Sequence, residues 1–269
     1  MPLHLGAGVG ALSNQSEQLA HEACSRLRFA EGLRRRSAQA RAESAIREAS
    51  ALALLSGARV PPARLRELTM ADPNVAPVDS ADEAVAIGAW RATWSLLDSL
   101  PPLNERRSAG VSTPARTPLA ARLAGWHRDL AASLVDAGLA DLGQVTIPRN
   151  PQRWQQLRQF LAADTDGSAL QRAARAWALL TIESPFAVAG EALGPLYAKW
   201  LLAVEGVEPA GVAVISALSN EGPRRAAALE AVRAGDWEPW YDFVAQSVIR
   251  GCEIGESLVR QVQAGQTGR

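Results

Sequence analysis

The sequence of 269 residues has few cysteines, few histidines and no net charge, and each shortage excludes a class of protein. The two cysteines, Cys24 and Cys252, stand near opposite ends and match no metal or redox spacing, so we expect two free buried thiols. Even together with the three histidines, these cysteines offer no plausible set of metal ligands, so we expect no metal site. A formal net charge of zero provides no general attraction to nucleic acid or to a membrane surface.

Long hydrophobic runs are also missing. No run reaches the length needed to span a bilayer, and the first residues lack the basic start and apolar stretch of a signal peptide. We therefore expect a cytoplasmic protein that binds neither nucleic acid nor membrane. Lys199 is the only lysine among the 28 basic residues, a bias typical of GC-rich, for example actinobacterial, genomes.

Apolar residues at helical spacing are abundant. They recur from Leu119 to Leu134, and a second amphipathic helix is predicted from Glu83 to Leu100 with Trp90 and Trp94 on its buried side. Across the chain this pattern predicts an all-α helical bundle. Strand propensity is confined to Val145-Thr146-Ile147, where a short β-hairpin is the most we expect, and the apolar residues 210–216 are predicted to form a short buried helix.

Composition divides the chain into four segments. We predict a flexible N-terminus at 1–15, an N-terminal helical region at 16–80, a helical core at 81–262 and a flexible tail at 263–269. In the second segment Arg34, Arg35 and Arg36 are interpreted as part of a solvated helix face, with docking of an acidic partner as the alternative.

The stretch from Trp177 to Gly194 links two apolar helices through a loop of small residues, a place where a helix N-terminus can bind an anion. Between Arg175 and Lys199, however, there is no Lys, Arg or His, whereas Glu183 and Glu191 flank the loop. Backbone dipoles alone would have to neutralise a triphosphate, and each helix terminus supplies only about half a charge. The loop is therefore not expected to bind a nucleotide.

The residues Glu183-Ser184-Pro185-Phe186 stand where the order of elements resembles the Fic (Fido) family of nucleotide-transfer enzymes, whose motif is I-H-P-F-x-[DE]-G-N-G-R. Pro185 and Phe186 match it directly. Further similarity lies in Glu48-Ala49 followed by Leu55-Ser56-Gly57, and in Ala228 to Phe243, which is similar to the family's G-D-[WL]-x-x-W-x-x-F ending. The resemblance covers about residues 40 to 262 and implies the family's helical bundle.

The resemblance also implies where the chemistry would be, and the required groups are missing. The general base is replaced by Ser184, the Mg²⁺ ligand by Val188 and the phosphate-binding Arg by Ala192, while Gly190 and Glu191 stand in the phosphate-binding turn. The family's inhibitory S-x-x-x-E-G motif has lost its polar groups in the same way. Its Ser is replaced by Leu52 and its Glu by Ser56, whereas its glycine is retained as Gly57.

These losses predict a catalytically inactive Fic-like pseudoenzyme without a cofactor, which binds an unidentified protein as scaffold or regulator and forms a homodimer. The alternative is an enzyme with a rebuilt pocket that uses Ser184 or Glu183 for residual nucleotidyl (AMP) transfer to a protein hydroxyl, or an oxidoreductase, although the βαβ pattern of a nicotinamide enzyme is missing. Three further candidates are interpreted as structural: His127 as a partly exposed helix residue, Asp164 and Asp166 as loop and capping residues, and Trp177 as a side chain that fills the former cleft.

Overall fold

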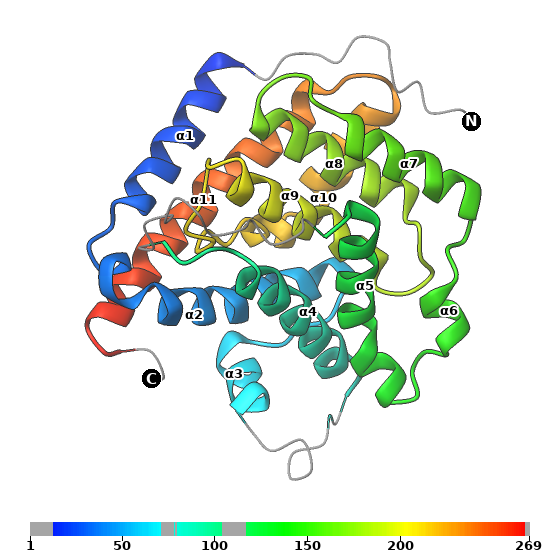
Figure 1. Cartoon of the computed structure of the whole chain (residues 1–269), viewed down its shortest axis with the longest axis horizontal. Coiled ribbons are helices and arrows are strands. Elements are labelled where there is room, and N and C mark those ends of the chain that lie inside the picture. Colours follow the sequence, from blue (N-terminus) through cyan, green and yellow to red (C-terminus); the bar gives the residue numbers. More distant parts are fainter. Residues whose placement is uncertain (1–12, 71–77, 79, 104–116, 267–269) are drawn as a thin grey trace, which may run out of the picture.

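The computed structural model describes residues 13–70, 78, 80–103 and 117–266. Within these ranges every regular element is a helix and no strand occurs, so the prediction of an all-α fold is confirmed (Figure 1). Most of the predicted flexible N-terminus and the last three residues of the predicted tail lie outside the described residues.

The α-helices are α1 (Asn14–Arg28), α2 (Leu33–Ala53), α3 (Pro62–Met70), α4 (Ala81–Asp98), α5 (Leu119–Asp136), α6 (Leu142–Thr146), α7 (Pro151–Ala163), α8 (Ala169–Glu183), α9 (Leu193–Val204), α10 (Gly222–Arg233) and α11 (Glu238–Gln263). Three short 3₁₀-helices join them, namely η1 (Leu54–Ser56), η2 (Gly190–Ala192) and η3 (Ala217–Asn220).

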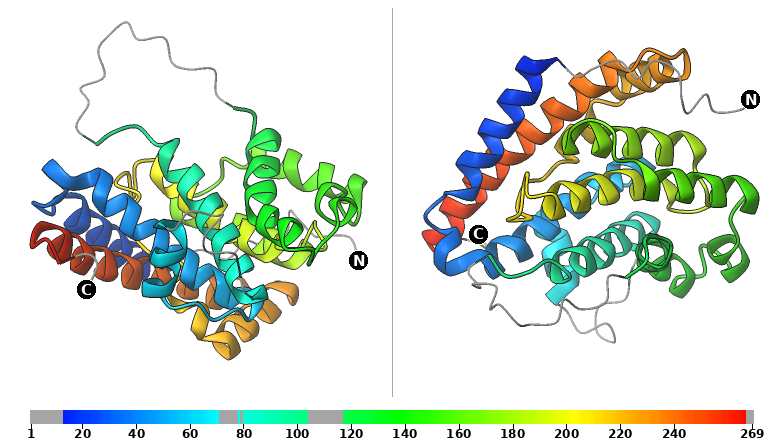
Figure 2. Two further views of the ribbon diagram at one scale, coloured as in Figure 1. Left: turned by 90° about the horizontal axis from the view of Figure 1, so that it is seen from below. Right: turned by 45° about the horizontal axis from the view of Figure 1, so that its top comes forward.

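The pair α8 and α9 lies at the centre of the bundle. Helix α9 also contacts α4 and α5, whereas α8 contacts α10 and α11. Helix α1 lies along α11, and α2 runs beneath the bundle against α4 and α11 (Figures 1 and 2). One buried core extends from Ala20 on α1 to Val262 on α11. Among the described residues, no helix is both long enough and apolar enough to span a membrane.

Local sequence explains where several helices begin and end. The side chain of Ser80 accepts a hydrogen bond from the backbone N–H of Glu83 and caps α4, as the sequence indicates. Gly57 ends η1 in the left-handed conformation, with φ of 80°. These local signals need no tertiary contact, so the sequence alone reveals them.

The prediction that Trp94 lies on the buried side of α4 is wrong, because its side chain is 39 % exposed. Small residues such as Ala89 and Ala92 occupy the buried face instead. The reason is the closeness of α5: a Cβ built on Gly88 would lie inside contact distance of the carbonyl oxygen of Leu130. Large side chains do not fit between two helices this close, so they lie on the other sides of α4.

The short β-hairpin that was the most expected between residues 138 and 151 does not form, because the short helix α6 stands there. Asp141 and Gln144 form a reciprocal capping box at its start, in which each side chain accepts a hydrogen bond from the other residue's backbone N–H. Ile147 ends the helix in an extended conformation. The capping box therefore outweighs the strand propensity of three residues.

Residues 210–216 do not form the predicted short helix. They cross the core as a buried segment without helix or strand. Such a segment has no regular ladder of hydrogen bonds, so its buried backbone groups need other partners. Arg41 donates from Nε to the carbonyl oxygen of Ala210 at 2.8 Å, Lys199 donates to that of Ala213, and a Glu48 oxygen accepts from Ser216 N–H at 3.1 Å. Charged side chains, together with the Gly251 carbonyl that accepts from Val214 N–H at 3.1 Å, replace the helical ladder here.

Candidate functional site

The candidate site is the loop between α8 and α9, residues 184–192, which holds the motif-like residues (Figure 1). Ser184 ends α8 in the left-handed conformation with φ of 38°, and Ala189 is left-handed as well, with φ of 55°. Left-handed backbone is unfavourable for residues with a side chain, by about 1–2 kcal/mol each. The loop is therefore strained, and contacts around it must hold it in place.

Aromatic side chains hold the middle of the loop. Phe186 is 5 % exposed and stacks on His127 of α5, with ring centroids 3.7 Å apart and planes inclined by 14°. Trp154 of α7 meets the same phenyl ring edge-on at 5.4 Å. Phe186 therefore anchors the loop to α5 and α7 together.

His127 is buried, and the interpretation of it as a partly exposed residue is wrong. Its Nε2 lies 2.8 Å from the carbonyl oxygen of Val188, and because a carbonyl only accepts, Nε2 carries the proton and donates. Burial lowers the pKa of His127, and the hydrogen bond to Val188 opposes this shift in part. The neutral imidazole thus serves as a backbone clamp on the loop.

The charges around the loop come from distant parts of the chain. Arg153 of α7 forms a two-point ion pair with Glu183, in which Nη2 lies 2.7 Å from Oε1. Just before α7, the backbone N–H of Arg149 donates to the Pro185 carbonyl at 2.8 Å. The charge of Glu191 opposes the lowering of the Arg225 pKa by burial. The expectation that only backbone dipoles would be available to neutralise an anion at this loop is therefore wrong. Arginines from other helices lie close to the loop in space, although none is near it in the sequence.

These arginines already interact with protein groups, and the first turn of α9 is closed. Leu193 is fully buried and Ala192 is 6 % exposed. A Cβ on Gly194 would lie 2.8 Å from both the Cδ1 and the carbonyl oxygen of Trp177. Trp177 is itself 2 % exposed and packs directly against the start of α9. This position is the one that a side chain filling the space between α8 and α9 would take.

The two motif-like segments, far apart in sequence, meet in the structure. Helix η1 with Ser56 contacts η2, which contains Gly190, Glu191 and Ala192. Leu52 is buried at the end of α2, whereas Ser56 and Gly57 are exposed. The structure therefore brings η1 and η2 together although more than a hundred residues separate them in the sequence.

The polar chemistry of the loop is limited. Ser184 is half-buried, and its Oγ would lie 3.6 Å from a Cβ built on Gly190, so it points across the turn. Among the described residues, no group of three or more His, Cys, Asp or Glu side chains could hold a metal ion. Val188 is half-buried and Glu191 is exposed.

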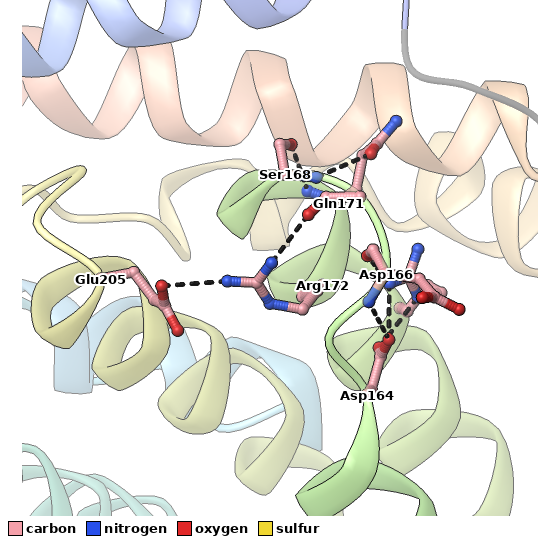
Figure 3. Close-up of polar contacts among 8 residues, drawn as sticks. Asp164, Asp166, Ser168, Gln171, Arg172 and Glu205 are labelled. Carbon is pink, nitrogen blue, oxygen red and sulfur yellow. Dashed lines mark hydrogen bonds and ion pairs between the residues drawn. The ribbon is translucent and has the colours of Figure 1, made fainter.

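The carboxylates Asp164 and Asp166 belong to the connection between α7 and α8, as predicted (Figure 3). Both oxygens of Asp164 accept from the guanidinium of Arg175, at 3.0 Å and 2.7 Å, and Oδ1 accepts from the backbone N–H of Asp166 at 3.3 Å. Ser168 and Gln171 form a capping box at the start of α8. This cluster therefore stabilises a turn and offers no acid/base pair.

Sequence reasoning missed Arg149, Arg153 and Trp154, all in or just before α7 and all in contact with the loop or with Glu183. One signal could have indicated them: Asn150-Pro151 starts a helix whose first turn presents Arg153 and Trp154 together. No family model matches the sequence, and neither does any curated protein.

Proposed function

We propose that this chain is a Fic-like helical bundle without catalytic activity, which acts in the cytoplasm by binding another protein. The contact between η1 and η2 supports the Fic-like part, because the inhibitory motif and the catalytic motif of that family would meet in this way. The substitutions at Ser184, Val188 and Ala192 remove the base, the metal ligand and the phosphate clamp. A homodimer belongs to the same proposal, with a second copy of the chain as the partner.

One observation carries the binding function. Leu139, Leu142 and Ile147 are exposed by 52 %, 67 % and 63 % within nine residues of chain around α6. We call this surface the α6 patch. Single exposed apolar residues are normal on proteins, whereas several close together mark interaction sites. Because Arg149 ties this segment to Pro185, the α6 patch lies beside the motif loop, where Fic-like enzymes would receive their target proteins.

The alternative of a rebuilt pocket has less support. A new general base would have to replace the missing histidine, and His127 is the only histidine that contacts the loop within the described residues. It is 2 % exposed, lies against Phe186 and donates its Nε2 proton to Val188. Glu183 is engaged by Arg153. Neither group is placed to accept a proton from a bound substrate.

Nucleotide chemistry is tested by titrating the purified protein with Mg²⁺-ATP in a calorimeter and by incubating it with labelled ATP and candidate protein targets. The expected result is neither saturable heat nor transfer of label. Saturable heat that disappears in a Ser184→Tyr variant, or label transfer to any protein, would contradict the inactive assignment.

The α6 patch is tested with the double variant Leu142→Gln/Ile147→Gln against the matched control Met70→Gln, because Met70 is 81 % exposed on α3. Sedimentation velocity of each purified protein measures self-association, and cross-linking in the native cell followed by mass spectrometry maps which residues contact a partner. We expect the double variant to lose the dimer or the cross-links at residues 139–147, while the control retains them. Equal behaviour of both variants would place the interface elsewhere.

A further inference from the structure

The two cysteines of the chain meet in the structure, although they stand 228 positions apart in the sequence. Cys24 lies on α1 and Cys252 on α11, and their Sγ atoms are 3.5 Å apart. Both thiols are free, as expected from the sequence, and they are 1 % and 0 % exposed. Two thiols in contact are the starting point for a disulfide bond. The pair joins only α1 and α11 and has no part in the proposed function.

Helices α1 and α11 lie side by side and run in the same direction (Figures 1 and 2). On one side of the thiols, Ser16 donates from Oγ to Oδ1 of Asp242 at 3.2 Å. On the other side, Nε of Arg26 lies 3.5 Å from Oε1 of Glu256. Polar contacts on both sides therefore keep the two helices in register, with the thiols opposite each other.

Close packing brings the two helices near each other at the thiols. Gly255 lies one turn beyond Cys252, and a Cβ built on it would lie 3.0 Å from Cδ2 of Leu27. A Cβ built on Gly251 would lie 2.6 Å from the carbonyl oxygen of Val214. Helix α11 is thus packed tightly between α1 and the segment 210–216. A disulfide needs such closeness, because its two sulfurs lie about 2.05 Å apart.

Helix α1 is the element whose opening can expose the thiols. It lies at one edge of the bundle, and α11 is its chief packing partner (Figure 1). Elements with few packing partners open locally at a lower cost in free energy than the core. While α1 is closed, the hydrogen bond to Cys24 and burial both raise the pKa of Cys252. Since the thiolate is the reactive form, the closed pair is protected and the open pair reacts.

We propose that Cys24 and Cys252, exposed by local opening of α1, are oxidised by a small-molecule disulfide to a reversible disulfide that locks α1 onto α11. One cysteine thiolate attacks a sulfur of the small disulfide and displaces its other half as a thiolate. The second cysteine thiolate then attacks the mixed disulfide at the protein sulfur, which closes the protein S–S bond and displaces the remaining half. The two displaced thiolates take up the two protons that the cysteines lost. The protein pair is oxidised by two electrons, and the small disulfide is reduced to two thiols.

The bond is tested by equilibrating the full chain with oxidised glutathione, blocking the remaining thiols with iodoacetamide and analysing unreduced peptides by mass spectrometry. We expect a peptide that joins Cys24 to Cys252, and a melting temperature about 10 °C above that of the reduced chain, because the bond closes a long loop in the unfolded state. Dithiothreitol should reverse both changes, and Cys24→Ala should show neither. Two free thiols after prolonged oxidation, or a disulfide that joins two chains, would overturn the proposal.

The route through α1 is tested by the rate of disulfide formation. Leu27→Ala weakens the packing of α1 on α11, and Leu123→Ala is the matched control, because both leucines are fully buried and Leu123 lies on α5. We expect Leu27→Ala to react at least about tenfold faster than the original chain, and Leu123→Ala to react at nearly the original rate. Oxidation should slow amide hydrogen exchange in α1 more than in α5. Equal acceleration by both variants, or equal slowing of exchange in both helices, would show that the thiols react through global unfolding and would overturn the proposed lock.

Discussion

Two irregular connections pass through this helical bundle, and their backbone groups are held in place by different kinds of contact. The α8–α9 loop is held chiefly by neutral contacts: Phe186 stacks on His127, and His127 donates to the Val188 carbonyl, while Arg149 adds a longer contact of 3.4 Å from Nη2 to the Ala187 carbonyl. The segment 210–216 crosses the interior and is held by charged groups, chiefly Arg41 and Lys199. A loop at the surface can use water for its remaining backbone groups, whereas a buried segment needs protein partners for nearly all of them.

The difference has an energetic consequence. A buried ion pair contributes little net stability, yet breaking it is costly, because the remaining partner is a buried charge without compensation. The contacts of the loop residues themselves are individually weaker, each worth about 1 kcal/mol or a little more. Substitutions in the two connections are therefore expected to differ in magnitude, and four experiments probe that difference.

The largest effect is expected for Lys199→Met. Lys199 and Glu48 are each 1 % exposed, and Nζ lies 3.5 Å from Oε2, so the variant leaves the Glu48 carboxylate buried without its counter-ion. We expect a loss of about 3–5 kcal/mol in the free energy of unfolding, measured by urea titration.

Two further variants make this measurement specific. Adding Glu48→Gln to Lys199→Met is expected to recover much of the loss, because a neutral amide can still accept from Ser216 N–H. Arg250→Met breaks the exposed pair with Glu253 and is expected to cost less than about 1 kcal/mol. A similar loss for Lys199→Met and Arg250→Met would show that the interior network does not hold the segment.

The second effect is a pH dependence from Glu208, which lies beside the same segment. Burial raises the pKa of Glu208 to about 7, opposed by Lys199, by the backbone N–H groups of Val212 and Ala213 and by Arg41. The folded state then binds more protons than the unfolded state between about pH 4.5 and pH 7. Stability therefore falls as the pH rises through this window, by on the order of 3 kcal/mol from this group.

Glu208→Gln isolates this contribution. The difference in unfolding free energy between the variant and the original chain is expected to change by that amount between pH 4.5 and pH 8, in favour of the variant at high pH. An unchanged difference across the window would mean that Glu208 ionises at its ordinary pKa in the folded state.

A smaller effect is expected in the loop. His127→Leu removes the hydrogen bond to Val188 and the stacked imidazole, and it should cost about 1–3 kcal/mol. Amide hydrogen exchange should increase across residues 184–192 more than in α1. The control His21→Leu changes an exposed histidine and should leave both readouts unchanged. Uniform exchange changes in the His127 variant would indicate general destabilisation without a specific role as a clamp.

Local patterns in the sequence predicted the helices but not these connections. Helix α5 follows from its leucines at helical spacing, and Gly57 and Ser80 reveal where elements end and begin. Residues 210–216 show only a short apolar run, which is compatible with helix or with extended chain. Their conformation depends on Arg41 and Lys199, whose side chains meet the segment only in the folded protein.

The same limit applies to the candidate site. Ser184, Val188 and Ala192 could be found by comparison with a motif, because the motif is contiguous. The contacts of His127 with a loop about sixty residues later, and of Arg153 with Glu183, are set by how α5 and α7 pack. No spacing rule encodes such long-range pairs, so the charge balance of the loop was predicted wrongly from its neighbours in sequence alone.

The smallest effect is expected from relieving strain in the loop. Ala189 has φ of 55° and ψ of 11°, a conformation that glycine adopts without steric cost, so Ala189→Gly should raise the free energy of unfolding by up to about 1 kcal/mol. Ala187 has no positive φ, and Ala187→Gly should lower it by several tenths of a kcal/mol through unfolded-state entropy alone. The opposite signs separate strain from flexibility. Equal destabilisation of both variants would show that Ala189 is not strained, and hence that the contacts of Phe186 and Val188 do not hold the loop in an unfavourable conformation. The loop and the charged interior segment would then differ in solvent exposure alone.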